Sequence, residues 1–328
     1  MHFNKLILFL FLTLSLQTKA DEIFKKKLFL MGCNFEVTVV ATSQENADEY
    51  IAAAEAEIVR IENLISSWDE ESETSSINRN AGRKATKVST ELIQLIERSI
   101  VISKLTDGAF DISYASMNQV WKFDGSMLEK PSDTTILQSV KLIDFTAIEI
   151  DQESSTVFLK KEGMKIGFGG IGKGYAADKA KQLLESKGVK AGIINASGDM
   201  NTWGNKPNGK PWEVAITNPL DKTKAFGLLP INNRAVVTSG NYEKYMVFDG
   251  VQYSHIINPR TGYPATGIIS VTVFAPKAEL ADALATSVFV MGIEVGINRI
   301  EQIPGVECII VDELGKLHQT KNIKIKPN

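Results

Sequence analysis

The segment MKIGFGGIGKGYAADKAKQLLESK, residues 164–187, contains the turn on which the predicted fold depends. Residues 164–168 have the composition of a β-strand, and residues 175–187 have the apolar spacing of a helix that Gly188 ends. Between them, four glycines within residues 169–174 let the backbone approach a ligand closely and place amide groups at a helix N-terminus. The pattern predicts a phosphate-binding turn, although such turns also occur for packing alone.

This turn differs from two well-known nucleotide-binding motifs. A dinucleotide fingerprint needs Gly-x-Gly-x-x-Gly in a strand–helix–strand unit, with an acidic residue about twenty positions later. A P-loop needs Gly-Lys followed by Ser or Thr, whereas Gly174 follows Lys173 here. Neither motif therefore accounts for the turn.

Strands and helices are mixed along the chain without strict alternation. Strand patterns occur over residues 28–41 and near 147–151, 156–160, 164–168, 191–195, 212–217, 235–238, 245–248, 269–275 and 306–311. Helical spacing occurs over residues 46–66, about 89–105 and about 279–291, while 66–80 and 115–145 read as loops. This order predicts an α+β fold of mainly antiparallel sheet with packed helices and, without a linker or repeat, a single domain.

The N-terminus has the organisation of a signal peptide. Lys5 precedes an apolar run over residues 6–12, and small residues end the segment at Ala20. The run is shorter than the roughly 20 apolar residues of a membrane-spanning helix, which disfavours an uncleaved anchor. Asp21 would follow the cut, so there is no cysteine there for lipidation. We therefore expect a cleaved signal peptide of residues 1–20 and a soluble, exported, periplasmic protein of residues 21–328.

Composition excludes several classes of function. The 328 residues are 44% hydrophobic and 23% charged with a net charge of −3, and the basic residues are spread along the chain. No basic stripe exists to bind nucleic-acid phosphates. With three histidines and two cysteines in all, a His/Cys zinc site is not expected. Cys33 and Cys308 read as buried thiols, and the sequence leaves a disulfide between them open.

Asp282 and Thr286 form a candidate cation site. Their i, i+4 spacing within the apolar segment ADALAT, residues 281–286, places both side chains on one face of a helix. A carboxylate with a hydroxyl suits Mg²⁺, which prefers oxygen ligands. The alternative is structural, because an acidic residue also stabilises the start of a helix and a threonine also bonds to its own backbone.

Three further loops carry groups suited to chemistry. His255 leads into the turn Asn258-Pro259-Arg260-Thr261-Gly262, which makes it a candidate for acid–base work or phosphate contact. Glycine-containing loops at residues 107–111 and 195–199 each present carboxylates. Because binding residues concentrate on loops held by a rigid scaffold, we expect these loops to converge on one site.

Taken in order, these motifs resemble the FAD:protein FMN transferase family, known as ApbE, from about Met31 to Thr320. The resemblance rests on Met31-Gly32, Ser67-Trp68 to Asn78, GAFD at 108–111, GGIGKGYAAD at 169–178, TSGNY at 238–242, HIINPRTG at 255–262 and ADALAT at 281–286. It implies a T-fold-like flavin transferase domain over residues 21–328. The implied reaction moves FMN from FAD to a threonine or serine hydroxyl of a target protein and releases AMP.

The resemblance also implies roles for individual residues. Mg²⁺ would be held by the Asp282 carboxylate, by Thr286, and by backbone oxygens at Ala285 and Gly170. FAD would contact Met31, Trp68, Ala109, Phe110, Asp111, Gly167, Lys173 and Ile256. His255 would take the proton from the incoming hydroxyl, with Asp282 or Asp111 as competing candidates for that role.

Three positions bear on the reaction and on its fit to the family pattern. Family members that transfer FMN carry an aromatic residue at the position of Trp68, and members that mainly hydrolyse FAD carry a small polar one, so Trp68 favours transfer. Gly167 replaces an aspartate common in the family, so a carboxylate contact to the flavin nucleotide is either missing or supplied by another residue. Ser197-Gly198-Asp199 replaces Gly-Gly-Asp and keeps the carboxylate.

Three functions are therefore compared. The first is transfer to flavin-accepting subunits of membrane redox complexes, of the sodium-translocating NADH:quinone reductase or Rnf type, at the outer face of the inner membrane. The second is a metal-dependent FAD pyrophosphatase that yields FMN and AMP. The third is a flavin-binding protein without turnover, against which the spacing of Asp282 and Thr286 counts.

Overall fold

An eight-stranded antiparallel sheet forms the body of the protein in the computed structural model, which describes residues 20–117, 120–123, 125–242 and 244–323. The strand order is β1-β2-β6-β7-β10-β13-β14-β15, and every neighbouring pair is antiparallel. The strands are β1 (Glu22–Leu30), β2 (Cys33–Ala41), β6 (Gly192–Ala196), β7 (Asp199–Trp203), β10 (Ala235–Gly240), β13 (Ile268–Ala275), β14 (Glu307–Asp312) and β15 (Leu317–Gln319). The predicted α+β class with antiparallel sheet is confirmed.

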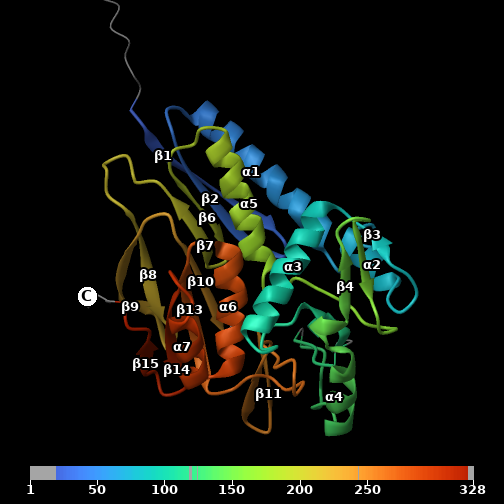
Figure 1. Ribbon diagram of the computed structural model, residues 1–328. Coiled ribbons are helices and arrows are strands. Elements are labelled where there is room, and N and C mark those ends of the chain that lie inside the picture. The colour runs from blue at the N-terminus through green and yellow to red at the C-terminus, as the bar shows by residue number, and fades with distance from the viewer. Residues whose placement is uncertain (1–19, 118–119, 124, 243, 324–328) are drawn as a thin grey trace, which may run out of the picture.

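Helices cover one face of this sheet and a hairpin covers the other (Figure 1). The helices are α1 (Gln44–Ile65), α5 (Gly172–Ser186), α6 (Ala278–Met291) and α7 (Ile293–Glu301), and the hairpin is β8 (Trp212–Asn218) with β9 (Asp221–Ile231). Side chains that alternate along each strand supply the two faces. On β10, Val237 joins the core under the helices, and Val236 joins the core under the hairpin.

A smaller lobe lies beside the helical face, at the right in Figure 1. It comprises α2 (Glu73–Arg79), α3 (Thr90–Leu105), α4 (Asp133–Ser139), the sheet of β3 (Thr86–Lys87), β5 (Thr156–Leu159) and β4 (Ile148–Asp151), and short 3-10 helices at Ile112–Met117, Val140–Leu142 and Phe145–Ala147. A hairpin of β11 (Tyr245–Phe248) and β12 (Val251–Ser254) lies below the main sheet. Buried residues of α3 and the β3–β5–β4 sheet belong to the same core as α1, α5 and α6, so the lobe is packed onto the body.

Two predicted strands differ from the structure. Residues 28–41 form the end of β1, a turn and β2, because Met31 and Gly32 both take positive φ, of 52° and 69°, and reverse the chain in two residues. Residues 164–168 are not a strand. Asn78 instead holds the backbone of Ile166 from both sides, with Nδ2 donating to its carbonyl at 3.0 Å and Oδ1 accepting from its N–H at 2.8 Å.

The sequence reading also missed some elements and leaves others untested. It missed α2, α4 and α7, the last because it begins directly after Gly292 ends α6. The predicted signal peptide falls almost entirely outside the described residues. No helix among those residues is both long and apolar enough to cross a membrane. Four strands separate β2 from β14, so at about 4.8 Å per strand Cys33 and Cys308 lie too far apart for a disulfide.

Gly174 permits the close approach of α5 and α6. A Cβ added there would lie 2.2 Å from the carbonyl oxygen of Ala278, a backbone atom that cannot move alone. We expect Gly174→Ala to lower the free energy of unfolding by about 1–3 kcal/mol, measured by urea denaturation, despite alanine's better helix propensity. Gln182→Ala is the control, since Gln182 is an exposed residue of the same helix. Equal stability of the Gly174 variant and the wild type would contradict this account.

Candidate active site

The N-termini of α5 and α6 meet, and each is capped by a carboxylate from the other helix. The Gly174 N–H in the first turn of α5 donates to Asp282 Oδ2 at 3.1 Å. In return, the Asp178 carboxylate on α5 accepts from the N–H groups of Ala278 and Glu279, at 2.9 and 3.0 Å. Neither helix has a side-chain cap of its own. The positive ends of two helices are thereby brought to one place, which favours an anionic ligand there.

Lys173 adds a positive charge at the start of α5. Its ammonium group forms an ion pair with Asp199, whose side chain is only 1% exposed at the first position of β7. Ser197 and Gly198, with φ of 53° and 106°, make the tight turn that delivers Asp199 to this position. Lys173 itself is partly exposed, so the buried carboxylate orients it while leaving it accessible to a ligand.

Asp282 is 3% exposed, and burial raises the pKa of its carboxyl group. The positive charge of Lys173 and the Gly174 N–H oppose that rise. Both groups stabilise the ionised form of Asp282. Thr286 lies one turn further along α6 and is half-buried. A Cβ at Gly170 would be 3.3 Å from the Thr286 hydroxyl oxygen, so the backbone of Gly170 lies beside that group.

These residues fit a hard divalent cation. A carboxylate, a hydroxyl and neighbouring backbone carbonyls are the oxygen donors that Mg²⁺ takes in proteins, together with water and substrate phosphate. Ala285 is fully buried and would contribute only its backbone. In the described part of the chain no group of three or more His, Cys, Asp or Glu residues is suited to hold a metal, so a cation here would depend on neutral oxygens besides Asp282.

Tyr114 also contacts the glycine turn, and no sequence motif predicted this. Its phenol group is hydrogen-bonded to the backbone of Gly169, and burial raises its pKa, with a further contribution from the charge of Asp282. A Cβ at Gly169 would lie 2.4 Å from the phenol oxygen. Tyr114 therefore packs against the glycine turn, and glycine is required there because the ring occupies the space.

The predicted flavin contacts at Met31, Trp68 and Gly167 surround the same turn. Met31 Cε lies 3.7 Å from a Cβ position at Gly172, and the Met31 N–H donates to Glu62 at 3.0 Å. The Trp68 side chain is 81% exposed, so its ring is free to stack on a planar ligand. The space beside Gly167 is filled, with Ala115 Cβ at 3.1 Å from a Cβ position there.

The segment Ala109–Asp111 contributes packing more than charge. Phe110 Cε2 lies 3.5 Å from a Cβ position at Gly170, and Ala109 is buried. Asp111 Oδ1 accepts from the N–H and hydroxyl of Ser113, at 2.8 and 2.6 Å, and Oδ2 accepts from the Phe145 N–H at 3.0 Å. Both oxygens are thus engaged within the lobe, which makes Asp111 a poor candidate for a proton acceptor.

His255 directly follows β12, and the charge of Lys173 acts on its imidazole. Burial lowers the pKa of its imidazole, and the positive charges of Lys244 and Lys173 lower it further. Nδ1 lies 3.2 Å from the Lys244 carbonyl, and because a carbonyl only accepts, Nδ1 carries the proton and Nε2 holds a lone pair. The neighbouring Ile256 is buried. Arg260 instead bonds the carbonyl of Asp107 at 2.7 Å, which gives it a structural role.

The geometry defines an α+β protein with two facing helix N-termini, a lysine beside them and a carboxylate–hydroxyl pair on α6. The sequence model of the ApbE family matches residues 31–310, and the chain belongs to that family.

Relatives and solved structures agree with this assignment. An FAD:protein FMN transferase of Klebsiella pneumoniae is 31% identical over 267 residues, covering 80% of this chain and 83% of the relative. One from Treponema pallidum is 30% identical, covering 76% and 73%. The ApbE protein of Thermotoga maritima superposes with a TM-score of 0.84 at 33% identity, covering 92% and 97%. The flavinyl transferase ApbE of Pseudomonas stutzeri gives 0.82 at 25% identity, covering 92% and 96%.

The Asp178 cap can be tested by substitution. Burial raises the pKa of Asp178 to about 6, and its carboxylate accepts from the backbone N–H groups of Ala278 and Glu279 and from the Asn201 side-chain amide. We expect Asp178→Ala to lower the free energy of unfolding by about 3 kcal/mol, because two buried backbone N–H groups and the Asn201 amide lose their acceptor. Asp178→Asn keeps one acceptor oxygen and should lose about half as much.

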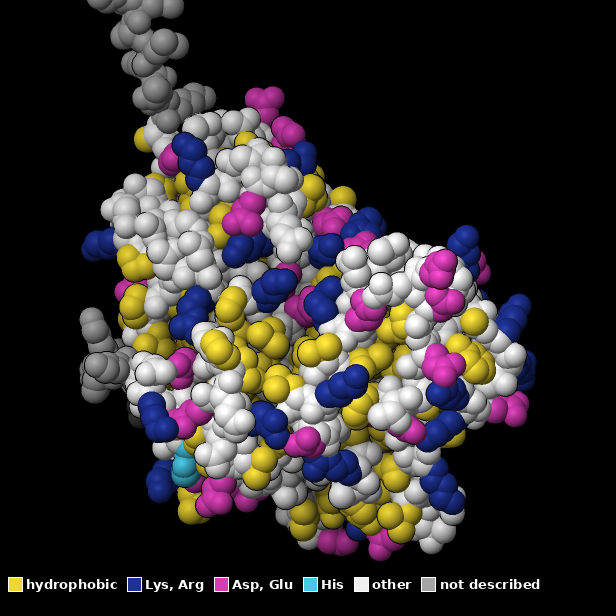
Figure 2. All heavy atoms as spheres, viewed as in Figure 1, with side chains coloured by type: hydrophobic (Ala, Val, Ile, Leu, Met, Phe, Trp, Pro, Cys, Tyr) yellow, Lys and Arg dark blue, Asp and Glu magenta, His cyan; other side chains and the backbone are white. Residues whose placement is uncertain are grey.

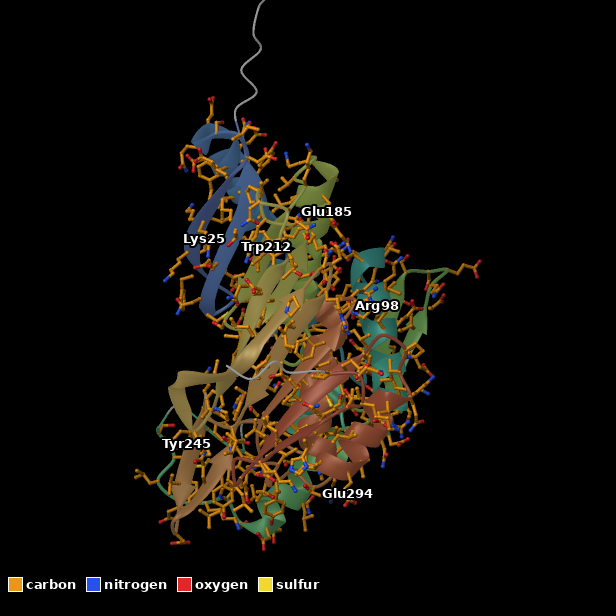
Figure 3. All side chains as sticks on the ribbon, turned by 90° about the vertical axis from the view of Figure 1, so that its left-hand side faces the viewer. Lys25, Arg98, Glu185, Trp212, Tyr245 and Glu294 are labelled. Carbon is orange, nitrogen blue, oxygen red and sulfur yellow. The ribbon has the colours of Figure 1, made fainter. Side chains whose placement is uncertain are left out.

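Urea denaturation measures both variants. Glu185→Ala is the matched control, since this exposed residue lies on the same helix (Figure 3). If Asp178→Ala were no less stable than Glu185→Ala, the capping role would be wrong.

Proposed function

We propose that this protein transfers FMN from FAD to a threonine or serine hydroxyl of a target protein, with release of AMP, in a Mg²⁺-dependent reaction. The observation that carries the proposal is the convergence of Lys173, Asp282, Thr286 and the Gly170 backbone at two capped helix N-termini. Such a site suits the pyrophosphate of FAD. The names of the relatives as FAD:protein FMN transferases support the same reaction.

The chain's own groups account for binding and orientation. The helix N-termini and Lys173 favour the negative pyrophosphate, and the exposed ring of Trp68 offers a surface for stacking. Asp282, Thr286 and backbone oxygens at Gly170 and Ala285 would hold Mg²⁺. When bound, this cation would neutralise phosphate charge and polarise the phosphorus under attack.

His255 is the residue best suited to accept the proton. The acceptor hydroxyl oxygen forms a bond to the phosphorus of the FMN moiety, the bond from that phosphorus to the bridging oxygen breaks, and AMP leaves with that oxygen. The hydroxyl proton passes to Nε2 of His255, which is unprotonated in the assigned tautomer. Asp111 is engaged by Ser113 and Phe145, so its geometry does not favour the competing assignment.

Hydrolysis of FAD to FMN and AMP is a side reaction in this proposal, since water can replace the hydroxyl. The aromatic Trp68 favours transfer over hydrolysis. The predicted signal peptide supports export, and the acceptors would then be flavin-binding subunits of membrane redox complexes, of NADH:quinone reductase or Rnf type, at the outer face of the inner membrane.

The first test incubates residues 21–328 with FAD, Mg²⁺ and a candidate acceptor domain, and reads acceptor mass and free AMP. We expect an FMN-sized mass gain with matching AMP. Asp282→Asn keeps an acceptor for the Gly174 N–H but removes the charge, so activity and calorimetric Mg²⁺ binding should both fall at least tenfold while folding is retained.

Asp48→Ala, at an exposed position on α1, is the control for this substitution. Free FMN and AMP with every acceptor unmodified would show a pyrophosphatase, and no AMP at all would leave only a flavin-binding protein. Unchanged Mg²⁺ affinity in Asp282→Asn would show that Asp282 does not bind the metal.

The pH dependence tests His255. Because its pKa is lowered from 6.5, the neutral base is present at neutral pH and is lost only as the pH falls through that lower value. The acid limb of the transfer rate should therefore have its midpoint below pH 6.5. His255→Gln should slow transfer about 100-fold and flatten that limb. An unchanged limb in the variant would assign the proton to another group.

A further inference from the structure

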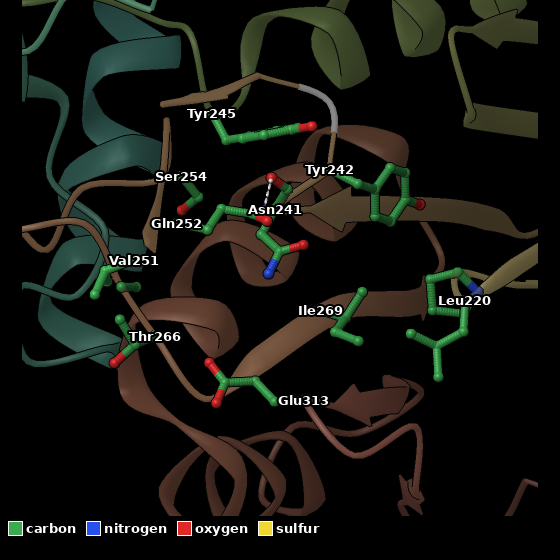
Figure 4. Close-up of a pocket in the computed structure, with 12 residues that line it drawn as sticks. Leu220, Asn241, Tyr242, Tyr245, Val251, Gln252, Ser254, Thr266, Ile269 and Glu313 are labelled. Carbon is green, nitrogen blue, oxygen red and sulfur yellow. Dashed lines mark hydrogen bonds between the residues drawn. The ribbon is translucent and has the colours of Figure 1, made fainter. Parts of the chain in front are cut away.

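A cavity of about 450 Å³ opens between the β11–β12 hairpin and the start of β13 (Figure 4). Its walls come from the β11–β12 hairpin, the loop after β10, the start of β13 and the turns of β8–β9 and β14–β15. The described residues that line it are Pro219, Leu220, Asn241, Tyr242, Tyr245, Val251, Gln252, Ser254, Ala265, Thr266, Ile269 and Glu313. None of the roles assigned above to flavin nucleotide or cation uses these residues.

The cavity and the active site share one strand as a wall. Gln252 and Ser254 of β12 line the cavity, and Tyr245, which pairs with Ser254, lies on the same face of the hairpin. The intervening Tyr253 points to the opposite face, where it stacks on Trp121. His255 follows the same alternation and contacts Phe123 there, at 6.4 Å between ring centroids. A molecule in the cavity would therefore lie one backbone away from the imidazole.

An exposed apolar rim surrounds the cavity. Leu220 is 61% exposed, Tyr245 is 49% exposed, and Leu314 next to the lining residue Glu313 is 91% exposed. Leu220 also lies against Gly315, since its Cδ1 is 2.5 Å from a Cβ position there, so the two turns form one continuous edge. Figure 3 shows Tyr245 at the lower end of the molecule. A concave surface with tyrosines and an apolar rim is typical of protein–protein contact sites.

The charge of the lining residues favours a neutral ligand over an anionic one. The twelve lining residues include no Lys, Arg or His, and Glu313 is their only charged member. A phosphate or the anionic part of a dinucleotide would meet a carboxylate here, with no cationic side chain among the described lining residues. The amides and hydroxyls of Asn241, Gln252, Ser254 and Thr266 instead suit the backbone and small polar side chains of a polypeptide.

We propose that this cavity and its rim dock the acceptor protein, holding the segment that carries the modified threonine or serine so that its hydroxyl reaches the active site past Ser254 and His255. The inference rests on the proposed function, which requires a protein as second substrate. It commits to a neutral, hydroxyl-bearing polypeptide segment as the occupant.

The test separates acceptor binding from the flavin site. Leu220→Ser and Tyr245→Ser remove apolar rim contacts, and Leu137→Ser on α4 is the matched control, because Leu137 is also an exposed leucine and does not line the cavity. Steady-state transfer is measured against acceptor concentration at saturating FAD, and FAD affinity is measured by calorimetry without acceptor. Each rim variant should raise the KM for acceptor about tenfold, with FAD affinity and acceptor-free AMP release within twofold of wild type.

Three outcomes would overturn the docking surface. An unchanged KM for acceptor in both rim variants would place the acceptor elsewhere. A parallel loss of FAD affinity would make the cavity part of the nucleotide site. A change of oligomeric state in size-exclusion chromatography would make the rim a contact between copies of this chain. Failure of the wild-type protein to modify any acceptor would instead refute the proposed function, which keeps the two results distinguishable.

Discussion

The mutual capping of α5 and α6 is the interaction on which the site depends. Asp178 satisfies the first N–H groups of α6, and Asp282 satisfies an N–H in the first turn of α5, so neither helix can shift without exposing a buried donor of the other. The contact requires Gly174, whose missing side chain lets the helices touch. An ion pair between Arg98 of α3 and Glu279, at 2.5 Å, anchors the first turn of α6 from the lobe. This ion pair ties the lobe to the turn of α6 that precedes Asp282.

The charged groups that are costly to bury are the same groups that the proposed site uses. Burying Asp282 raises its pKa, and the nearby Lys173 offsets part of that effect. Lys173 is in turn held by the buried Asp199. A cation and an anionic substrate would complete a set of charges that the protein alone balances only in part. Away from the site, charged side chains of both signs are interspersed on the face shown in Figure 2, without a basic stripe.

The spacing of apolar residues and the capping residues predicted those elements that are determined by neighbours in the sequence. The helix expected over 46–66 is α1 at Gln44–Ile65, because its apolar residues recur at helical spacing and Ser43 caps it. The segment 164–168 has strand-like residues but lies beside Asn78 and the Ile112 carbonyl rather than another strand, which only tertiary structure reveals. Asp282 and Thr286 were predicted as site residues from their i, i+4 spacing, and the glycine turn from its four glycines. Tyr114 was not predicted, since it lies in no motif and its partner Gly169 is distant in sequence. Asp178 ends the GGIGKGYAAD motif, but its capping role was not predicted because its partners on α6 lie about 100 residues later.

The alternation of side chains on β12 has a kinetic meaning if the cavity docks the acceptor. Ser254 faces one side and His255 the other, so donor and acceptor would occupy separate compartments divided by a single strand. Neither substrate would have to leave before the other entered. The enzyme would then work through a ternary complex, with sequential kinetics and without a covalently flavinylated intermediate of its own. The opposite orientation of two successive residues would then allow both substrates to be bound at the same time.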